Sequence, residues 1–174
     1  NYGDPKAGPE FVTEMLFEFL DLGGINQIDL RGWRASDDTI LYHATLRALS
    51  ESYGQDVNAF GEACRRAYLD SVDDIASRHP GDITKGSLRE QKRINWDQLE
   101  YDGDARGSGS AMRAGCIGIF YPGEIDRDEL IARAVESSRI THNSATAILG
   151  SVTAALFTAL ALERVEVEEW PHRL

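Results

Sequence analysis

The chain has 174 residues, of which 42% are hydrophobic, and this size and composition fit one globular domain with its own core. It carries 29 acidic and 18 basic residues, so its formal net charge of -11 argues against general binding to nucleic acids or acidic membranes. An anionic ligand would therefore need a locally favourable site.

The cysteines and the first residues bear on where the protein works. Cys64 and Cys116 lie far apart in apolar surroundings and have neither the density of a disulfide framework nor the spacing of a zinc site. The opening NYGDPKAGPEF lacks the features of a signal peptide and reads as a cut or processed start. We therefore expect a reducing, intracellular setting and a cytoplasmic protein.

Apolar residues recur at helical spacing along most of the chain. The first stripe follows Pro9 and ends at Gly23 and Gly24. Its members are Phe11, Val12, Met15, Leu16, Phe19 and Leu20. A second stripe consists of Ile40, Leu41, Ala44, Ala48 and Leu49. A third, which Pro80 and Gly81 end, consists of Val57, Phe60, Cys64, Ala67, Tyr68 and Ile75.

The second half of the chain continues the helical pattern. Asp126 and Glu129 predict a capping box before a further helix. The run GCIGIFY, residues 115–121, is short and apolar and could also be a strand. There is no internal repeat and no long linker, so the sequence predicts an all-α fold in a single domain over residues 1–174. The three tryptophans are expected to pack in the core or between subdomains; they are Trp33, Trp96 and Trp170.

A long uncharged segment, residues 144–162, raises the question of a membrane span. Its hydroxyl and small residues, without an aromatic belt or a flanking basic cluster, favour instead the buried central helix of a soluble bundle. Thr141, His142 and Asn143 precede it as candidate helix caps. We therefore expect no membrane partner.

Two bare carboxylates, Asp37 and Asp38, stand where a helix is expected to begin. Free backbone N–H groups and the helix dipole favour acids there, which is a sufficient structural explanation. Ser36 and Thr39 add hydroxyl oxygens, so the patch also suits Mg²⁺. A DDxxD diphosphate motif is excluded because Leu41 occupies the place of its last acid.

The loop at residues 101–113 is the second unusual stretch. Arg106 and Arg113 stand where a calcium loop needs oxygen ligands, and the Walker and nucleophile-elbow patterns are absent. What remains is ARGSGSAMR, whose small residues enter an apolar helix at Met112 and could hold an anion on backbone amides. A plain flexible connection is the alternative. His142 could likewise contact a base or phosphate, cap a helix or pack in the core.

Four segments in this order resemble the ADP-ribosylglycohydrolase family, the group that includes the dinitrogenase reductase-activating glycohydrolase. The segments are SDDT at 36–39, GSLREQKR at 86–93, GSGSAMRAGCIGIFY at 107–121 and THNSATAILGSVTAALFTALAL at 141–162. The resemblance covers about residues 30–162, and its specificity lies in the order and spacing of the segments.

The resemblance implies an irregular, orthogonal all-α bundle with two Mg²⁺ ions in a cleft, which removes ADP-ribose from a modified side chain or a related glycoside. The implied metal ligands are Ser36, Asp37 and Asp38. The implied diphosphate site consists of Arg106, Gly107, Ser108, Gly109 and Ser110, supported by a helix that begins with Met112 and Arg113. His142 is implied to lie near the adenosine or its neighbouring phosphate.

The proposed reaction cleaves the bond at the anomeric carbon of the distal ribose and develops oxocarbenium character. Metal ions that hold the ribose hydroxyls would fix the sugar for attack by an activated water. Asp37 and Asp38 would therefore act as positioning and electrostatic groups, and neither is assigned as the general acid.

The chain departs from the family pattern in three places. Members usually carry a glycine-rich opening helix with an acidic residue, and a second Asp-x-Asp-Thr cluster, and neither is found in this sequence. The usual histidine-proline pair is replaced by Asn143 and Ser144. We therefore expect a piece or short member of the family, truncated at both ends, whose missing metal ligands come from another segment or partner.

Two carboxylates and a hydroxyl leave most of two octahedral shells to water, so this chain alone is not expected to bind both ions tightly. Two alternatives remain open for the polypeptide. It could be a non-catalytic module that binds ADP-ribose or a partner, or a purely structural helical domain.

Overall fold

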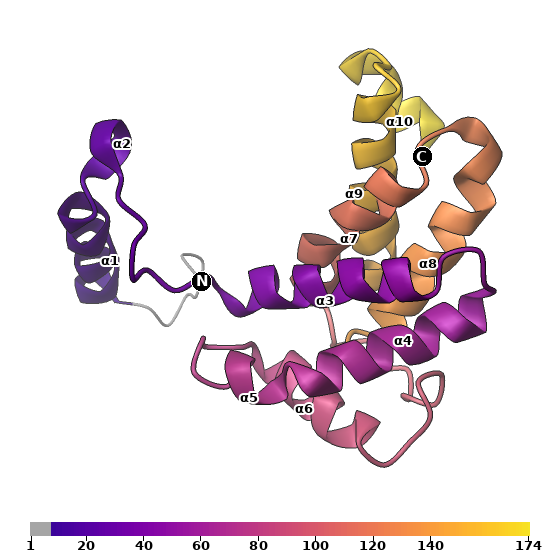
Figure 1. Ribbon diagram of the computed structural model, residues 1–174, viewed down its shortest axis with the longest axis horizontal. Helices are drawn as coiled ribbons and strands as arrows, with labels where there is room; N and C mark the ends of the chain where they lie inside the picture. The colour runs from indigo at the N-terminus through magenta and orange to yellow at the C-terminus, as the bar shows by residue number, and fades with distance from the viewer. Residues whose placement is uncertain (1–7) are drawn as a thin grey trace. The chain divides into compact units, whose positions relative to one another are not determined.

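The computed structural model describes residues 8–174, which form helices joined by turns and loops (Figure 1). Their contacts divide into two compact units, one ending at Arg34 and the other spanning Ala35–Leu174. Within residues 8–174 there is no β-strand, so the all-α prediction is confirmed. The single domain over residues 1–174 stays a prediction.

The first unit contains α1, Pro9–Asp21, and α2, Gly24–Gln27. Gly23 ends α1 as predicted, with a φ of 103° that a residue bearing a Cβ rarely adopts. The first apolar stripe is not buried against the rest of residues 8–34, because Val12 and Leu16 are each more than half exposed.

Three side chains of this unit were also expected to be buried. Those of Phe11 and Met15 lie outside the described residues. Trp33 is 46% exposed, so it does not lie in a core, and its packing between subdomains stays a prediction.

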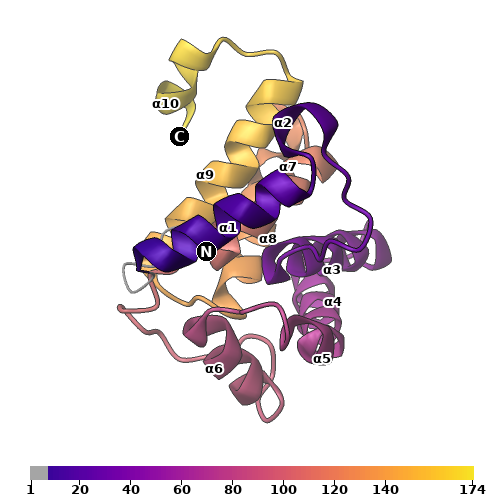
Figure 2. The same ribbon diagram turned by 90° about the vertical axis from the view of Figure 1, so that its left-hand side faces the viewer.

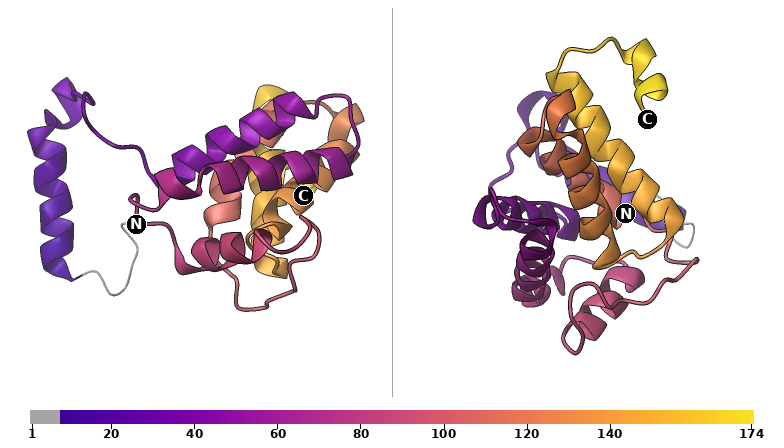
Figure 3. Two further views of the ribbon diagram at one scale, coloured as in Figure 1. Left: turned by 60° about the horizontal axis from the view of Figure 1, so that its bottom comes forward. Right: turned by 90° about the vertical axis from the view of Figure 1, so that its right-hand side faces the viewer.

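The second unit opens with α3, Asp37–Glu51, followed by α4, Val57–Asp70, and the short α5, Val72–Ile75. Ser36 caps α3, so the predicted start of this helix is confirmed. Figures 1 and 3 show α3 and α4 side by side, and their apolar stripes supply much of the core. The third stripe is divided between α4 and α5.

Helix α6, Asp82–Gln91, was missed by the sequence analysis. Its buried face consists of Thr84, Leu88 and Gln91, of which only the leucine is apolar. Hydrogen bonds hold this face to the rest of the second unit. For example, Gln91 Nε2 donates to the carbonyl of Ile140 over 3.1 Å. The periodicity of apolar residues therefore carried little signal here.

Helices α7, Gly109–Phe120, α8, Arg127–Arg139, and α9, Ala145–Leu162, complete the core. Helices α7 and α9 approach each other closely at Gly118, where an added Cβ would lie 2.1 Å from the carbonyl oxygen of Ala155. The alternative of a strand at 115–121 is wrong, because these residues lie in α7 and the turn after it.

Two predicted helix starts are corrected. Asp126 makes no side-chain cap for α8, and Glu129 pairs with Arg133 instead of closing a capping box. Helix α9 is capped by Ser144, which accepts from the backbone N–H of Ala147 over 3.3 Å, and not by residues 141–143.

Helix α9 is long and apolar enough to cross a membrane by length and composition, with a mean hydropathy of 1.9, a test that core helices of soluble proteins also pass. It packs against α7 and α8 through one face only, and 33% of it is buried. Leu149 and Leu162, on this helix, are more than half exposed. The expected burial all round the helix is therefore wrong for the described chain.

A 3₁₀ turn, η1, Glu124–Asp126, lies between α7 and α8, and a second one, η2, Val167–Glu169, leads from α9 into the short helix α10, Trp170–Arg173. After α9 the chain turns back, so that Trp170 packs on Phe157 with ring centroids 5.1 Å apart (Figure 2). Trp96 packs so closely on α4 that a Cβ at Gly61 would lie 2.5 Å from its ring. These two tryptophans are partly buried against the core, as predicted.

Candidate functional site

The acidic pair occupies the first turn of α3. Ser36 precedes it and accepts from the backbone N–H of Thr39 over 3.5 Å, so the hydroxyl serves as a weak helix cap. Asp37 is buried, with 8% exposure, and Asp38 is half-buried. Among the ion pairs of the described residues none includes either carboxylate.

The surroundings of this pair disfavour its negative charge. Burial raises the pKa of Asp37, and the neighbouring carboxylate of Asp38 raises it further, although backbone hydrogen bonds at the helix start act in the opposite direction. Burial also raises the pKa of Asp38, against a lowering effect of Arg113. The helix dipole alone would favour the charged form of these acids, so the direction of both shifts reflects burial first.

Arg113 is fully buried near the start of α7 and is held by protein acceptors. Its guanidinium donates to the carbonyl of Ser137 over 2.6 Å, to Thr141 Oγ1 over 2.7 Å and to the carbonyl of Gly109 over 3.2 Å. It also lies over the ring of Tyr68, 4.7 Å from the centroid. The sequence analysis placed Arg113 among residues that bind substrate, whereas its burial and its hydrogen bonds make it an internal anchor of the loop.

His142 is buried against the glycine-containing turn that precedes α7. A Cβ at Gly107 would lie 3.1 Å from His142 Nε2, and a Cβ at Gly109 would lie 3.0 Å from Cε1. Thr141 Oγ1 holds the other ring nitrogen, Nδ1, at 2.9 Å. Burial lowers the pKa of His142 to about 3, and Arg113 adds to the shift, so the imidazole is neutral at physiological pH.

The acidic pair and the glycine turn precede or begin two helices that pack against each other in the second unit. Helices α3 and α7 pack against each other, and a Cβ at Gly115 would lie 4.0 Å from Cε2 of Tyr42, one turn after the acids. The electrostatic effect of Arg113 on Asp38 also indicates proximity. The structure therefore packs the helix that the acidic pair begins against the helix that follows the glycine turn.

The remaining predicted contacts of the diphosphate point in different directions. Arg106 is exposed and pairs with Asp104 over 3.2 Å. Ser108 and Met112 are exposed and contact each other, with 3.8 Å between Oγ and Sδ. Ser110 is buried and donates to the carbonyl of Ala147 over 3.2 Å, so its side chain serves the packing of α7 on α9.

The donor set at the start of α3 fits Mg²⁺ in kind, because carboxylate and hydroxyl oxygens are the ligands that this ion prefers. In the described chain Asp37 and Asp38 form no ion pair, although Arg113 acts on Asp38 electrostatically, and Ser36 and Thr39 supply hydroxyls beside them. Over residues 8–174 no group of three or more His, Cys, Asp or Glu side chains gathers to hold a metal ion. These oxygens alone would fill only part of an octahedral shell.

The sequence analysis missed two residues of α6 that lie beside the site. Thr84 of α6 borders the glycine turn, with its Oγ1 3.6 Å from a Cβ at Gly109. Ser87, also on α6, donates to the carbonyl of Thr141 over 2.7 Å and fixes the backbone before His142. The segment 86–93 was quoted as part of the family resemblance, which was the available signal, but no role followed from it.

Comparison with known proteins gives consistent matches. The profile of the family described as ADP-ribosylglycohydrolase matches residues 6–173. "Putative ADP-ribosyl glycohydrolase L444" of Acanthamoeba polyphaga mimivirus is 53% identical over 178 residues, which cover 100% of this chain and 34% of that protein. "ADP-ribosylhydrolase ARH1" of Dictyostelium discoideum is 35% identical over 162 residues, which cover 88% of this chain and 41% of that protein. The chain thus spans well under half the length of these relatives.

Proposed function

Because the chain belongs to the ADP-ribosylglycohydrolase family, we propose that it forms part of a Mg²⁺-dependent site that removes ADP-ribose from a modified substrate. The bond cleaved would be the glycosidic bond at the distal ribose. The remaining metal ligands would come from a segment or partner outside this chain.

One observation carries the proposal: two adjacent carboxylates at the start of α3 have raised pKa values, and within residues 8–174 neither forms an ion pair. Placing such charges out of water costs free energy unless a cation binds beside them. Asp37 and Asp38, with the hydroxyl of Ser36, would hold the ion. A bound Mg²⁺ supplies positive charge that orients the ribose hydroxyls and stabilises charge that develops during cleavage.

The start of α7 would receive the diphosphate. Gly107 and Gly109 leave the backbone accessible, and the free N–H groups at the start of a twelve-residue helix favour an anion. Arg106 is exposed beside this turn and could exchange its ion pair with Asp104 for one with phosphate.

The neutral His142 defines the floor of the turn through its contact with both glycines. It would present an apolar or hydrogen-bonding ring edge to the nucleoside, without adding charge. Asp37 and Asp38 act by position and electrostatics, and no residue of this chain is assigned the proton transfer to the leaving group.

The test is calorimetry of ADP-ribose binding with and without Mg²⁺, together with release of ADP-ribose from an arginine- or serine-modified protein. We expect Mg²⁺ to strengthen binding by about tenfold or more, which corresponds to roughly 1.4 kcal/mol. Asp37→Asn should abolish this gain. Asp56→Asn is the matched control, because Asp56 also starts a helix and caps Ala59 N–H over 2.9 Å, but lies at α4.

A second candidate is a module that binds ADP-ribose without cleaving it. The absence, over residues 8–174, of a third metal-binding side chain near the pair favours this alternative for the isolated polypeptide. Binding that is indifferent to Mg²⁺, with no release of ADP-ribose, would replace the hydrolase proposal with this one. A lack of ADP-ribose binding under both conditions would reject the two together.

A further inference from the structure

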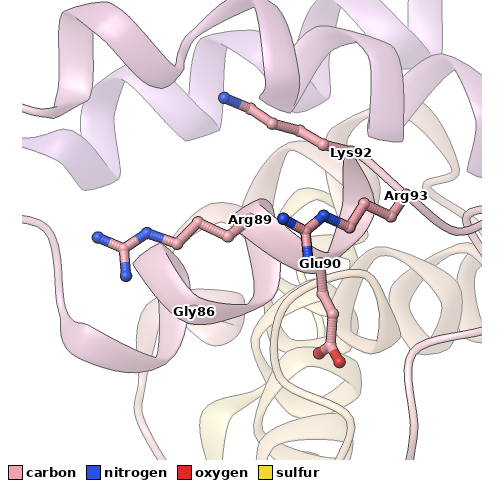
Figure 4. A pocket seen from close by; sticks show the side chains of 5 residues that line it. All are labelled: Gly86, Arg89, Glu90, Lys92 and Arg93. Carbon is pink, nitrogen blue, oxygen red and sulfur yellow. The ribbon is translucent and has the colours of Figure 1, made fainter.

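A group of cations lies on the outer side of α6, away from the residues that hold this helix to the core. Arg89, Lys92 and Arg93, with Gly86 and Glu90, line a hollow of about 310 Å³ (Figure 4). The cations stand at i, i+3 and i+4, a spacing that places them on one face at the end of a helix. We call this set the α6 basic face.

The charges of the α6 basic face are not neutralised by the protein. In the part of the chain that the structure describes, no carboxylate forms an ion pair with Arg89, Lys92 or Arg93. Glu90 lines the same hollow, but its carboxylate extends away from the ends of Arg89 and Lys92 (Figure 4). By contrast Lys85, one turn earlier on α6, is paired with Asp82 over 2.6 Å.

The opposite side of α6 contacts the residues around the glycine turn, and these contacts fix where the α6 basic face lies relative to the turn. Thr84 borders the turn, and Ser87 binds the carbonyl of Thr141 beside His142. A macromolecule whose modified side chain enters the site would therefore pass near α6. The α6 basic face is suited to a part of the substrate other than ADP-ribose.

We propose that the α6 basic face binds a short acidic segment of the protein that carries the ADP-ribose. Three cations match two or three carboxylates, and the two arginines can hold carboxylates by paired hydrogen bonds. A long polyanion such as a nucleic acid fits less well, because the rest of the chain, with a net charge of -11, repels it. This inference rests on the proposed function for the identity of its partner, but not for its binding test.

The binding test uses fluorescence anisotropy of a labelled peptide of six glutamates, at low salt and at about 150 mM salt. Arg89→Gln/Arg93→Gln removes two charges from the face. The matched control, Arg47→Gln/Arg66→Gln, removes two charges from exposed positions on α3 and α4. We expect the first variant to bind the peptide about tenfold more weakly than the unmodified chain, and the control to bind within about twofold.

Three outcomes would overturn the proposal: no binding of the peptide at low salt, equal weakening in both variants, or tighter binding of an oligothymidylate of equal charge. The last would identify a nucleic-acid surface instead. The test has a readout independent of ADP-ribose. If Mg²⁺-dependent binding of ADP-ribose persists while the peptide fails to bind, only the role of the α6 basic face is rejected.

Discussion

Helices α3 and α7 pack against each other, yet the charged groups near their starts have opposite surroundings. The cation of α7, Arg113, is fully buried and donates to three protein oxygens over 2.6 to 3.2 Å. The acids of α3, Asp37 and Asp38, have raised pKa values and no cation bound to them within the described chain. The cation near the start of α7 is therefore held by protein acceptors, whereas the carboxylates at the start of α3 form no ion pair in the described chain.

This difference separates the residues that build the site from those that would act in it. Removing Arg113 should damage the fold, because buried acceptors would lose their donor. Neutralising an acid of the pair should leave the fold intact or improve it, because an unfavourable charge disappears. The following experiments test that contrast, from the largest expected effect to the smallest.

Arg113→Met should reduce the free energy of unfolding by about 3 kcal/mol, since several buried acceptors would be left without a donor. Urea denaturation followed by circular dichroism would measure the loss. Arg106→Met is the matched control at an exposed position and should change stability by less than about 0.5 kcal/mol. Equal midpoints for the two variants would show that Arg113 does not anchor the loop.

His142 should make the fold sensitive to acid. Its pKa in the folded chain, about 3, lies below its ordinary value of 6.5, so the stability it confers is complete above pH 6.5 and is lost as the pH falls toward 3. At pH 5, which is 1.5 pH units below the ordinary pKa of 6.5, the free energy of unfolding should be lower by about 2 kcal/mol, at about 1.4 kcal/mol for each pH unit. Chemical shifts of the ring measured by NMR between pH 5 and 8 should show no titration of His142. A midpoint near 6.5 would contradict its burial.

The helices that the sequence predicted well are those with an apolar face. Leu41, Ala48 and Leu49 recur at helical spacing, and the start of α3 was also marked by Ser36 and the acidic pair. Helix α6 gave no such signal. Its inner face is held through Ser87 and Gln91, whose acceptors lie 54 and 49 residues further along the chain.

The candidate site was predictable in its members but not in their roles. The resemblance implied that Arg113 begins the helix that supports the diphosphate site, and nothing in the local sequence indicated that its guanidinium is buried. Its burial depends on acceptors at Ser137 and Thr141, 24 and 28 residues away. The sign of the pKa shift at Asp37 likewise depends on the packing of α3, because the helix start alone would lower the pKa.

Gly109→Ala should modestly reduce the free energy of unfolding, because it disturbs the glycine turn. The new Cβ would lie 3.0 Å from the buried ring of His142, which Thr141 holds in place, so we expect a loss of about 1 kcal/mol. Gly86→Ala is the control, because a Cβ there meets no atom within 4 Å and the change should stabilise α6 by up to about 1 kcal/mol. Thermal unfolding would compare them, and a stabilising Gly109→Ala would refute tight contact with the ring.

The substitution with the smallest expected effect on stability, Asp37→Asn, tells the most about the acidic pair. Asp37→Asn should raise the stability of the metal-free chain by roughly 0.5 kcal/mol at pH 7, a figure reduced for solvent screening. The pKa of Asp37 in the folded chain lies above the unfolded value of 3.8, so the gain should be absent below pH 3.8 and should grow as the pH rises through the folded pKa.

We expect added Mg²⁺ to reverse the order of stability of the unmodified chain and the Asp37→Asn variant. It should stabilise the unmodified chain and not the Asp37→Asn variant, because only the former keeps both carboxylates. Thermal unfolding at pH 4 and pH 7, with and without Mg²⁺, would separate the effects. If Asp37→Asn destabilises the metal-free chain at pH 7 and Mg²⁺ shifts both proteins equally, the pair is a helix start and the contrast between α3 and α7 has no functional meaning.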